Sequence, residues 1–115
     1  MKGKGFIAIR EEDDLIRELL ERWLGEAGYR LRPQGDEQPR LVVANVPSAH
    51  GAQRIIEALR AVYAAPVLVL SGRFRRGLAG SAEAARRLGV KKVLPKPFTR
   101  EELLSAVRES LEDAA

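Results

Sequence analysis

Cysteine is absent from this sequence, and long apolar runs are absent as well. Without cysteine, the 115 residues can hold neither a disulfide framework nor a thiolate centre. No apolar run approaches the roughly 18 residues that a membrane-spanning helix requires. The basic N-terminus is not followed by the apolar stretch of a secretory signal. We therefore expect a protein of the bacterial or archaeal cytoplasm that has no membrane partner.

Histidine occurs once, and aromatic residues make up only 5% of the chain. His50 stands at a predicted loop–helix junction with no second ligand or orienting base nearby, so a surface position is favoured over a metal or phosphohistidine role. The chain is 45% hydrophobic and 31% charged, as globular proteins are. This composition and length predict a single domain over residues 1–115.

Charge is unevenly distributed along the chain, although the net charge is only +4. Residues 11–26 carry seven acids and two arginines, whereas residues 73–92 carry seven bases and one acid. The basic stretch has a single interleaved aromatic residue, Phe74, and no recognition-helix motif, which disfavours nucleic acid as its partner. A solvated face or a protein-binding face fits it better.

Short apolar runs alternate with stretches of helical periodicity along the whole chain. The pattern predicts helices over about 16–27, 55–62, 84–88 and 103–111, and Thr99 with Glu102 forms a capping box before the last one. Continuous apolar strands between helices are typical of a parallel sheet that is covered on both faces. The predicted strands are a short edge strand, Tyr29–Arg32, and four core strands, Phe6–Ile9, Leu41–Ala44, Val67–Leu70 and Val90–Leu94.

Polar side chains follow the core strands at the points where the strands end. Carboxylates come after the first strand, an amide after the second, a hydroxyl after the third and an ammonium after the fourth. Since parallel strands end at the same edge of a sheet, these groups should converge there. Such a set of groups is typical of a divalent-cation or phosphoryl site. Its members are Glu11, Glu12, Asp13, Asp14, Asn45, Ser71 and Lys96.

Three segments of the sequence resemble the receiver domains of bacterial two-component response regulators. They are Ile16–Leu20, Pro66–Gly72 and, above all, Leu94–Phe98. The resemblance extends over nearly the whole chain, and the order and spacing of the three segments together make it specific. The resemblance implies a flavodoxin-like, three-layer α/β sandwich with a five-stranded parallel sheet. It also implies a cis peptide bond between Lys96 and Pro97.

Receiver domains accept a phosphoryl group from a histidine kinase on an aspartate, next to an Mg²⁺ ion held by two further acids. The resemblance places these two acids at Glu11 and Glu12. It places the hydroxyl and the lysine that contact the phosphoryl group at Ser71 and Lys96. The phosphoacceptor position falls on Asn45, whose neutral amide is a poor nucleophile and forms no acyl phosphate. Loss of this anionic oxygen also weakens any Mg²⁺ site, so we expect no cofactor beyond weakly held Mg²⁺.

Two further departures point the same way. Receiver domains have an aromatic residue, the switch aromatic, that swings inward on phosphorylation. Its position corresponds to Val93, a stiff β-branched residue that lacks two side-chain orientations to switch between. The second helix of the family is missing, because only Pro33–Arg40 separate the predicted edge strand Tyr29–Arg32 from the predicted core strand Leu41–Ala44. The uncovered sheet face should then be an interaction surface, and Ile7, Ile9, Val42 and Ala44 are candidates for it, depending on which way the pleat points.

The sequence therefore predicts a pseudo-receiver, a protein-interaction module of signal transduction that works without aspartyl phosphorylation. It would not be an enzyme, would take no small-molecule substrate, and would bind another signalling protein or its own copy. One alternative is a conventional phosphorelay receiver with an unrecognised acceptor. Another is a basic nucleic-acid-binding domain, which a steep salt dependence of binding would reveal. A nucleotide-binding enzyme is disfavoured, because no glycine-rich phosphate loop follows any strand.

Overall fold

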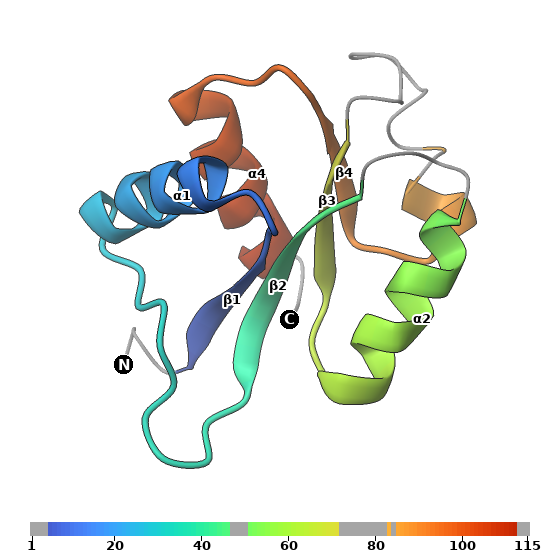
Figure 1. Cartoon of the computed structure of the whole chain (residues 1–115), viewed down its shortest axis with the longest axis horizontal. Coiled ribbons are helices and arrows are strands. Elements are labelled where there is room, and N and C mark those ends of the chain that lie inside the picture. Colours follow the sequence, from blue (N-terminus) through green and yellow to red (C-terminus); the bar gives the residue numbers. More distant parts are fainter. Residues whose placement is uncertain (1–4, 47–50, 72–82, 84, 113–115) are drawn as a thin grey trace.

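The computed structural model of the protein describes residues 5–46, 51–71, 83 and 85–112. Figure 1 shows three layers, with a sheet between helices on either side. Residues 85–88 are helical as well. The regular elements are β1 (Phe6–Arg10), α1 (Asp14–Glu26), β2 (Pro39–Asn45), α2 (Ala52–Val62), β3 (Val67–Ser71), β4 (Lys92–Pro95) and α4 (Arg100–Glu112).

The sheet is parallel and its four strands follow chain order, β1-β2-β3-β4. Its register brings Val43 beside Leu68 and Val69 beside Val93. The strands are almost fully apolar because both faces of the sheet are covered, so neither set of alternating side chains meets water. The sequence prediction of a parallel α/β sandwich is confirmed.

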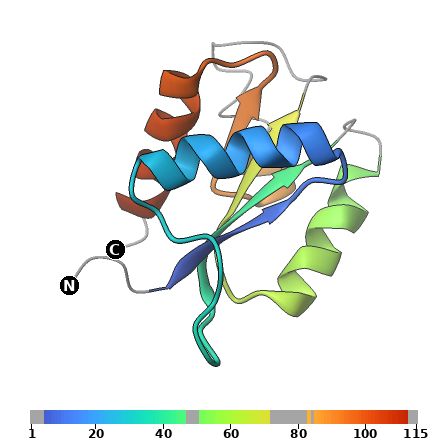
Figure 2. The ribbon, with the colours of Figure 1, turned by 60° about the vertical axis from the view of Figure 1, so that its left-hand side comes forward.

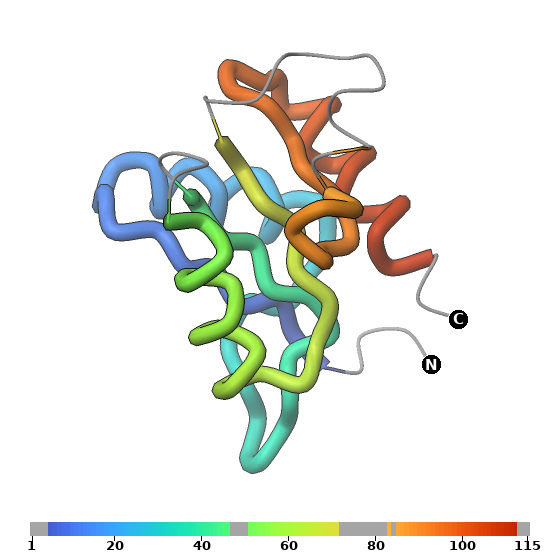
Figure 3. Tube along the Cα trace, turned by 90° about the vertical axis from the view of Figure 1, so that its right-hand side faces the viewer, coloured from blue at the N-terminus to red at the C-terminus, as the bar shows by residue number. Residues whose placement is uncertain are grey.

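Two hydrophobic clusters lie on opposite faces of this sheet. Figures 1 and 2 show α1 and α4 on one face and α2 on the other. The α2 face carries Phe6, Ala8, Val42, Ala44, Val67, Val69 and Val93, which pack against α2 and residues 85–88. The α1/α4 face carries Ile7, Leu41, Val43, Leu68 and Leu70, which pack against α1 and α4. Figure 3 views the molecule from the side of α2 and shows it next to the short helical segment 85–88.

The predicted fifth strand, Tyr29–Arg32, is wrong: these residues form an irregular segment, and the sheet described here has four strands. A backbone hydrogen bond from the Ile7 N–H to the Arg30 carbonyl, 2.9 Å long, still ties the segment to the outer edge of β1. The segment is followed at once by Pro33, which has no N–H to donate to a ladder. It must also turn back within a few residues to reach the start of β2.

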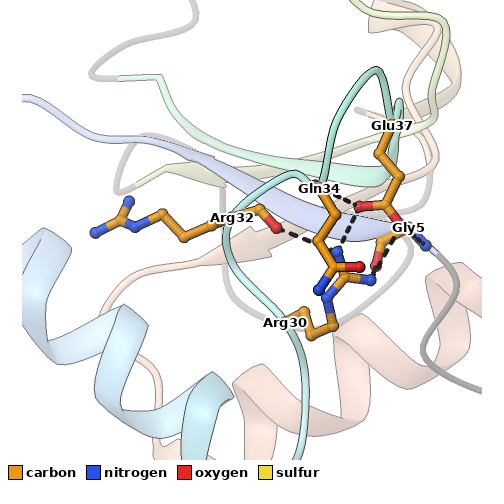
Figure 4. Close-up of polar contacts among 5 residues, drawn as sticks. All are labelled: Gly5, Arg30, Arg32, Gln34 and Glu37. Atoms are coloured by element: carbon orange, nitrogen blue, oxygen red, sulfur yellow. Dashed lines mark hydrogen bonds and ion pairs between the residues drawn. The ribbon is translucent and has the colours of Figure 1, made fainter.

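The second helix of receiver domains has no counterpart between α1 and β2, as the sequence predicts. A polar clamp holds the connecting loop instead (Figure 4). The Arg30 guanidinium donates to the Gly5 carbonyl, 2.8 Å away, and to the carboxylate of Glu37. That carboxylate also accepts from the backbone N–H groups of Gly5 and Gln34, each at 3.0 Å. The Arg30 hydrogen bond, followed by that of Gln34, lowers the pKa of Glu37 to about 2.

The predicted uncovered face needs correction. Ile7 lies on the α1/α4 face and is 2% exposed, whereas Val42 and Ala44 lie on the opposite face beneath α2 and are at most 1% exposed. Ile9 is half-buried against the α1/α4 face. Side chains alternate between the faces of a strand, and the pleat places Ile7 and Val42 on opposite faces of the sheet. The apolar residues that stay exposed lie instead on one flank of α2, where Ile55 and Val62 are 39% and 69% exposed.

Candidate functional site

The predicted polar groups meet at the carboxyl edge of the sheet. Asn45 and Ser71 are the last residues of β2 and β3, and Glu11 and Lys96 directly follow β1 and β4. Because the strands are parallel and in register, their ends bring these four residues to one edge. The peptide bond between Lys96 and Pro97 is cis, as the resemblance implies.

Asn45 and Lys96 contact each other directly. The Lys96 ammonium donates a hydrogen bond to the Asn45 side-chain oxygen at 2.5 Å, across 51 residues of sequence. The Lys96 backbone N–H donates to the Ser71 carbonyl at 2.9 Å, and Ser71 is fully buried. The amide oxygen of Asn45, at the position that the sequence resemblance assigns to the phosphoacceptor, thus accepts a hydrogen bond from the lysine.

The two predicted metal-binding acids differ sharply in environment. Glu11 is only 9% exposed, and one of its carboxylate oxygens accepts from the Asp13 N–H at 3.0 Å. The other oxygen, Oε1, is buried and accepts no hydrogen bond. Glu12 is exposed. No group of three or more histidine, cysteine or acidic side chains suited to a metal ion occurs in the part of the chain that the structure describes.

Asp13 and Arg17 have roles that the sequence analysis did not assign. Asp13 caps α1, because its side chain accepts from the Ile16 N–H at 3.0 Å. The Arg17 guanidinium donates to the Glu11 carbonyl at 2.9 Å and to the Asp14 carboxylate at 2.5 Å. The bond to Asp14 raises the pKa of Arg17. An aspartate before a helical apolar pattern is the signal that could have revealed the cap.

Val93 lies inside the sheet and not at the site's surface. It is 2% exposed, pairs with Val69 and belongs to the cluster beneath α2. A branched side chain in a close-packed core has no second position to occupy. His50 and the basic loop over residues 72–80 lie outside the described residues.

A groove of about 780 Å³ opens beside this site, between the start of α1 and the middle of α2. Its apolar lining comes mostly from α2, and its charged lining from the segment that joins β1 to α1. The lining residues are Ile9, Arg10, Glu11, Glu12, Asp13, Arg17, Ala44, Asn45, Ile55, Ala58 and Leu59.

Comparison with solved structures shows the fold. A response regulator receiver protein from Burkholderia phymatum matches with a TM-score of 0.69 and 20% identity, over 95% of this chain and 96% of the other. The chemotaxis protein CheY4 of Vibrio cholerae matches with a TM-score of 0.65 and 16% identity, over 95% of this chain and all of the other. This chain has a receiver-like fold.

A further solved structure that matches is a putative pilus assembly-related protein from Burkholderia pseudomallei. Its TM-score is 0.71 at 18% identity, and the match covers all of this chain and 95% of the other. No protein-family model matches the sequence, and no curated protein matches it. Within the residues placed by the structure, no helix is long and apolar enough to cross a membrane.

Proposed function

We propose that this receiver-like domain is a pseudo-receiver, a protein-interaction module of bacterial signal transduction that does not use aspartyl phosphorylation. The observation that carries the proposal is the hydrogen bond between the Asn45 amide oxygen and Lys96. The amide is neutral and its nitrogen lone pair is delocalised, so it makes no acyl phosphate. The similarity to solved receiver proteins supports the signalling role.

The surroundings of Asn45 support the same function. The Lys96 ammonium, which would contact a phosphoryl group in a receiver domain, already has the amide oxygen as its acceptor. The position of the switch aromatic is a buried valine, Val93. A domain without an acceptor and without a movable aromatic would present one constant surface to its partner.

A divalent cation would bind weakly at this edge. Among the residues that the structure describes, Glu11 alone offers a buried carboxylate oxygen that lacks a partner, while Glu12 is exposed to solvent. Mg²⁺ requires several oxygen ligands in nearly ideal octahedral geometry to offset its dehydration. We expect a dissociation constant of about a millimolar or weaker by calorimetry. Much tighter binding would mean that further ligands complete the site.

The test uses beryllium fluoride, which mimics a phosphoryl group on an aspartate. Addition of beryllium fluoride and Mg²⁺ should leave the amide NMR spectrum of the domain unchanged, whereas a conventional receiver should respond as the positive control. The Asn45→Asp variant should respond little, because Glu12 remains exposed and Val93 remains buried. A saturable change in the unmodified domain would favour the alternative of a phosphorelay receiver with another acceptor.

The nucleic-acid alternative has less support from the described residues. Part of the basic stretch is neutralised within the fold, since Lys92 pairs with Glu109 at 3.0 Å and Arg87 with Glu83 at 3.2 Å. DNA or RNA binding that weakens steeply with salt would nevertheless favour that alternative over the pseudo-receiver.

A further inference from the structure

One flank of α2 has an apolar stripe that its own core does not use. Ile55, Ala58 and Val62 recur three and four residues apart, so they lie on one side of the helix. Ile55 is 39% exposed and Val62 is 69% exposed, whereas the neighbouring Ile56 is 1% exposed in the core. We call these three residues the α2 stripe. Because no helix lies between α1 and β2, the missing helix cannot cover this flank.

The upper part of the stripe forms the apolar wall of the groove beside Asn45. Ile55 and Ala58 line it, together with the half-buried Leu59. The opposite wall is charged: it is formed by the acids Glu11, Glu12 and Asp13 together with Arg10 and Arg17. The groove therefore has an apolar side of helical spacing and a charged end at which the acids outnumber the bases.

Glu11 supplies the observation that specifies the ligand. Its Oε1 is buried without a hydrogen-bond donor, although Glu11 lines the groove. Lys96 binds Asn45, and Arg17 binds Asp14 and the Glu11 carbonyl. Arg10 also lines the groove, but it does not donate to this oxygen. Removing a carboxylate oxygen from water is costly unless a donor, best a cation, is supplied.

From these features we infer that the groove binds an amphipathic helix of a partner protein that carries an arginine or lysine in its first turn. Apolar residues of that helix pack on the α2 stripe, and its basic side chain donates to Glu11. The positive end of the helix dipole then also lies at the end of the groove where the acids outnumber the bases. The inference rests on the proposed function and names the surface and the partner chemistry through which it would act.

The experiment selects peptides against the immobilised, unphosphorylated full chain from a display library of helix-forming sequences about 14 residues long. Enriched peptides should have apolar residues at helical spacing and one arginine or lysine in the first turn. Their affinity should fall at least about tenfold for Ile55→Asp and for Glu11→Gln. Leu15→Asp is the matched control, because it places the same charge on an exposed leucine of α1 (77% exposed) and should leave affinity unchanged.

The groove assignment is overturned if no peptide is enriched, if enriched peptides lack the basic residue, or if they bind Ile55→Asp and Glu11→Gln normally. Circular dichroism of each variant separates a lost contact from a lost fold. The proposed function fails by a different result. If treatment with acetyl phosphate and Mg²⁺ changes peptide affinity, phosphorylation independence is wrong, even when the groove is confirmed by the variants.

Discussion

Replacing Glu11 with glutamine tests the environment of the buried carboxylate at the edge of the sheet. Glu11 is 9% exposed, and one oxygen has a hydrogen bond while the other has none. A buried polar atom without a partner costs about 1–3 kcal/mol. The glutamine oxygen can keep the bond to the Asp13 N–H, and the substitution removes the negative charge. We therefore expect Glu11→Gln to stabilise the fold.

Two opposing effects reduce the expected gain. The glutamine NH₂ group takes the unpartnered position, and the start of α1 loses a nearby negative charge worth about 0.3–1 kcal/mol. The net stabilisation should therefore lie near the lower limit, at about 1 kcal/mol. This corresponds to a rise in Tm of about 4 °C for a domain of this size.

Urea unfolding followed by circular dichroism at neutral pH measures this effect. Glu12→Gln serves as the control: Glu12 is exposed, so its substitution should change the free energy of unfolding by less than about 0.5 kcal/mol. If Glu11→Gln instead destabilises the domain by about 1 kcal/mol or more, the carboxylate has a favourable partner. That result would remove the argument for a cationic anchor in the groove.

Three further substitutions test the fold. The ionised Glu37 carboxylate stabilises the fold above its unfolded pKa near 4.5, and this stabilisation is lost as pH falls towards about 2. The urea midpoint of Glu37→Gln should therefore drop at neutral pH and approach that of the parent in acid. An unchanged midpoint at neutral pH would refute the role of the Arg30 clamp. Thr99→Ala should cost about 1 kcal/mol, since the Thr99 hydroxyl accepts from the Glu102 N–H at 3.0 Å; full stability would contradict the cap. Ile56→Ala should lower the free energy of unfolding by about 3 kcal/mol, because it leaves a cavity in the core. Leu15→Ala, at an exposed position, should lower it by less than about 0.5 kcal/mol. Equal losses for the two variants would show that α2 is misplaced.

The core elements were predictable because their signals are local. Continuous apolar runs gave β1, β2 and β3, and the reciprocal capping box before α4 is present, with Thr99 N–H to Glu102 at 2.9 Å and Glu102 N–H to Thr99 at 3.0 Å. Tyr29–Arg32 shows the limit of such signals. Its alternation is only four residues long, and the clamp at Arg30 depends on residues distant in sequence, which periodicity does not reveal.

The candidate site was predictable in position but not in detail. Parallel strand ends brought Asn45, Ser71 and Lys96 to one edge, as the sequence indicated. The sequence did not show that Glu11 would be buried while Glu12 stayed exposed, because their separation depends on how the chain enters α1. Nor did it show which face each strand residue would take, and Ile7 and Val42, both candidates for one surface, lie on opposite faces.

Intact-mass measurement after incubation with acetyl phosphate and Mg²⁺ tests the central claim most directly. The account predicts that the mass of the domain stays unchanged, while a conventional receiver treated in parallel gains a phosphoryl group. A stoichiometric phosphoryl adduct on this chain would contradict the account. It would show that a nucleophile other than the Asn45 amide accepts the group and that the domain is a working receiver.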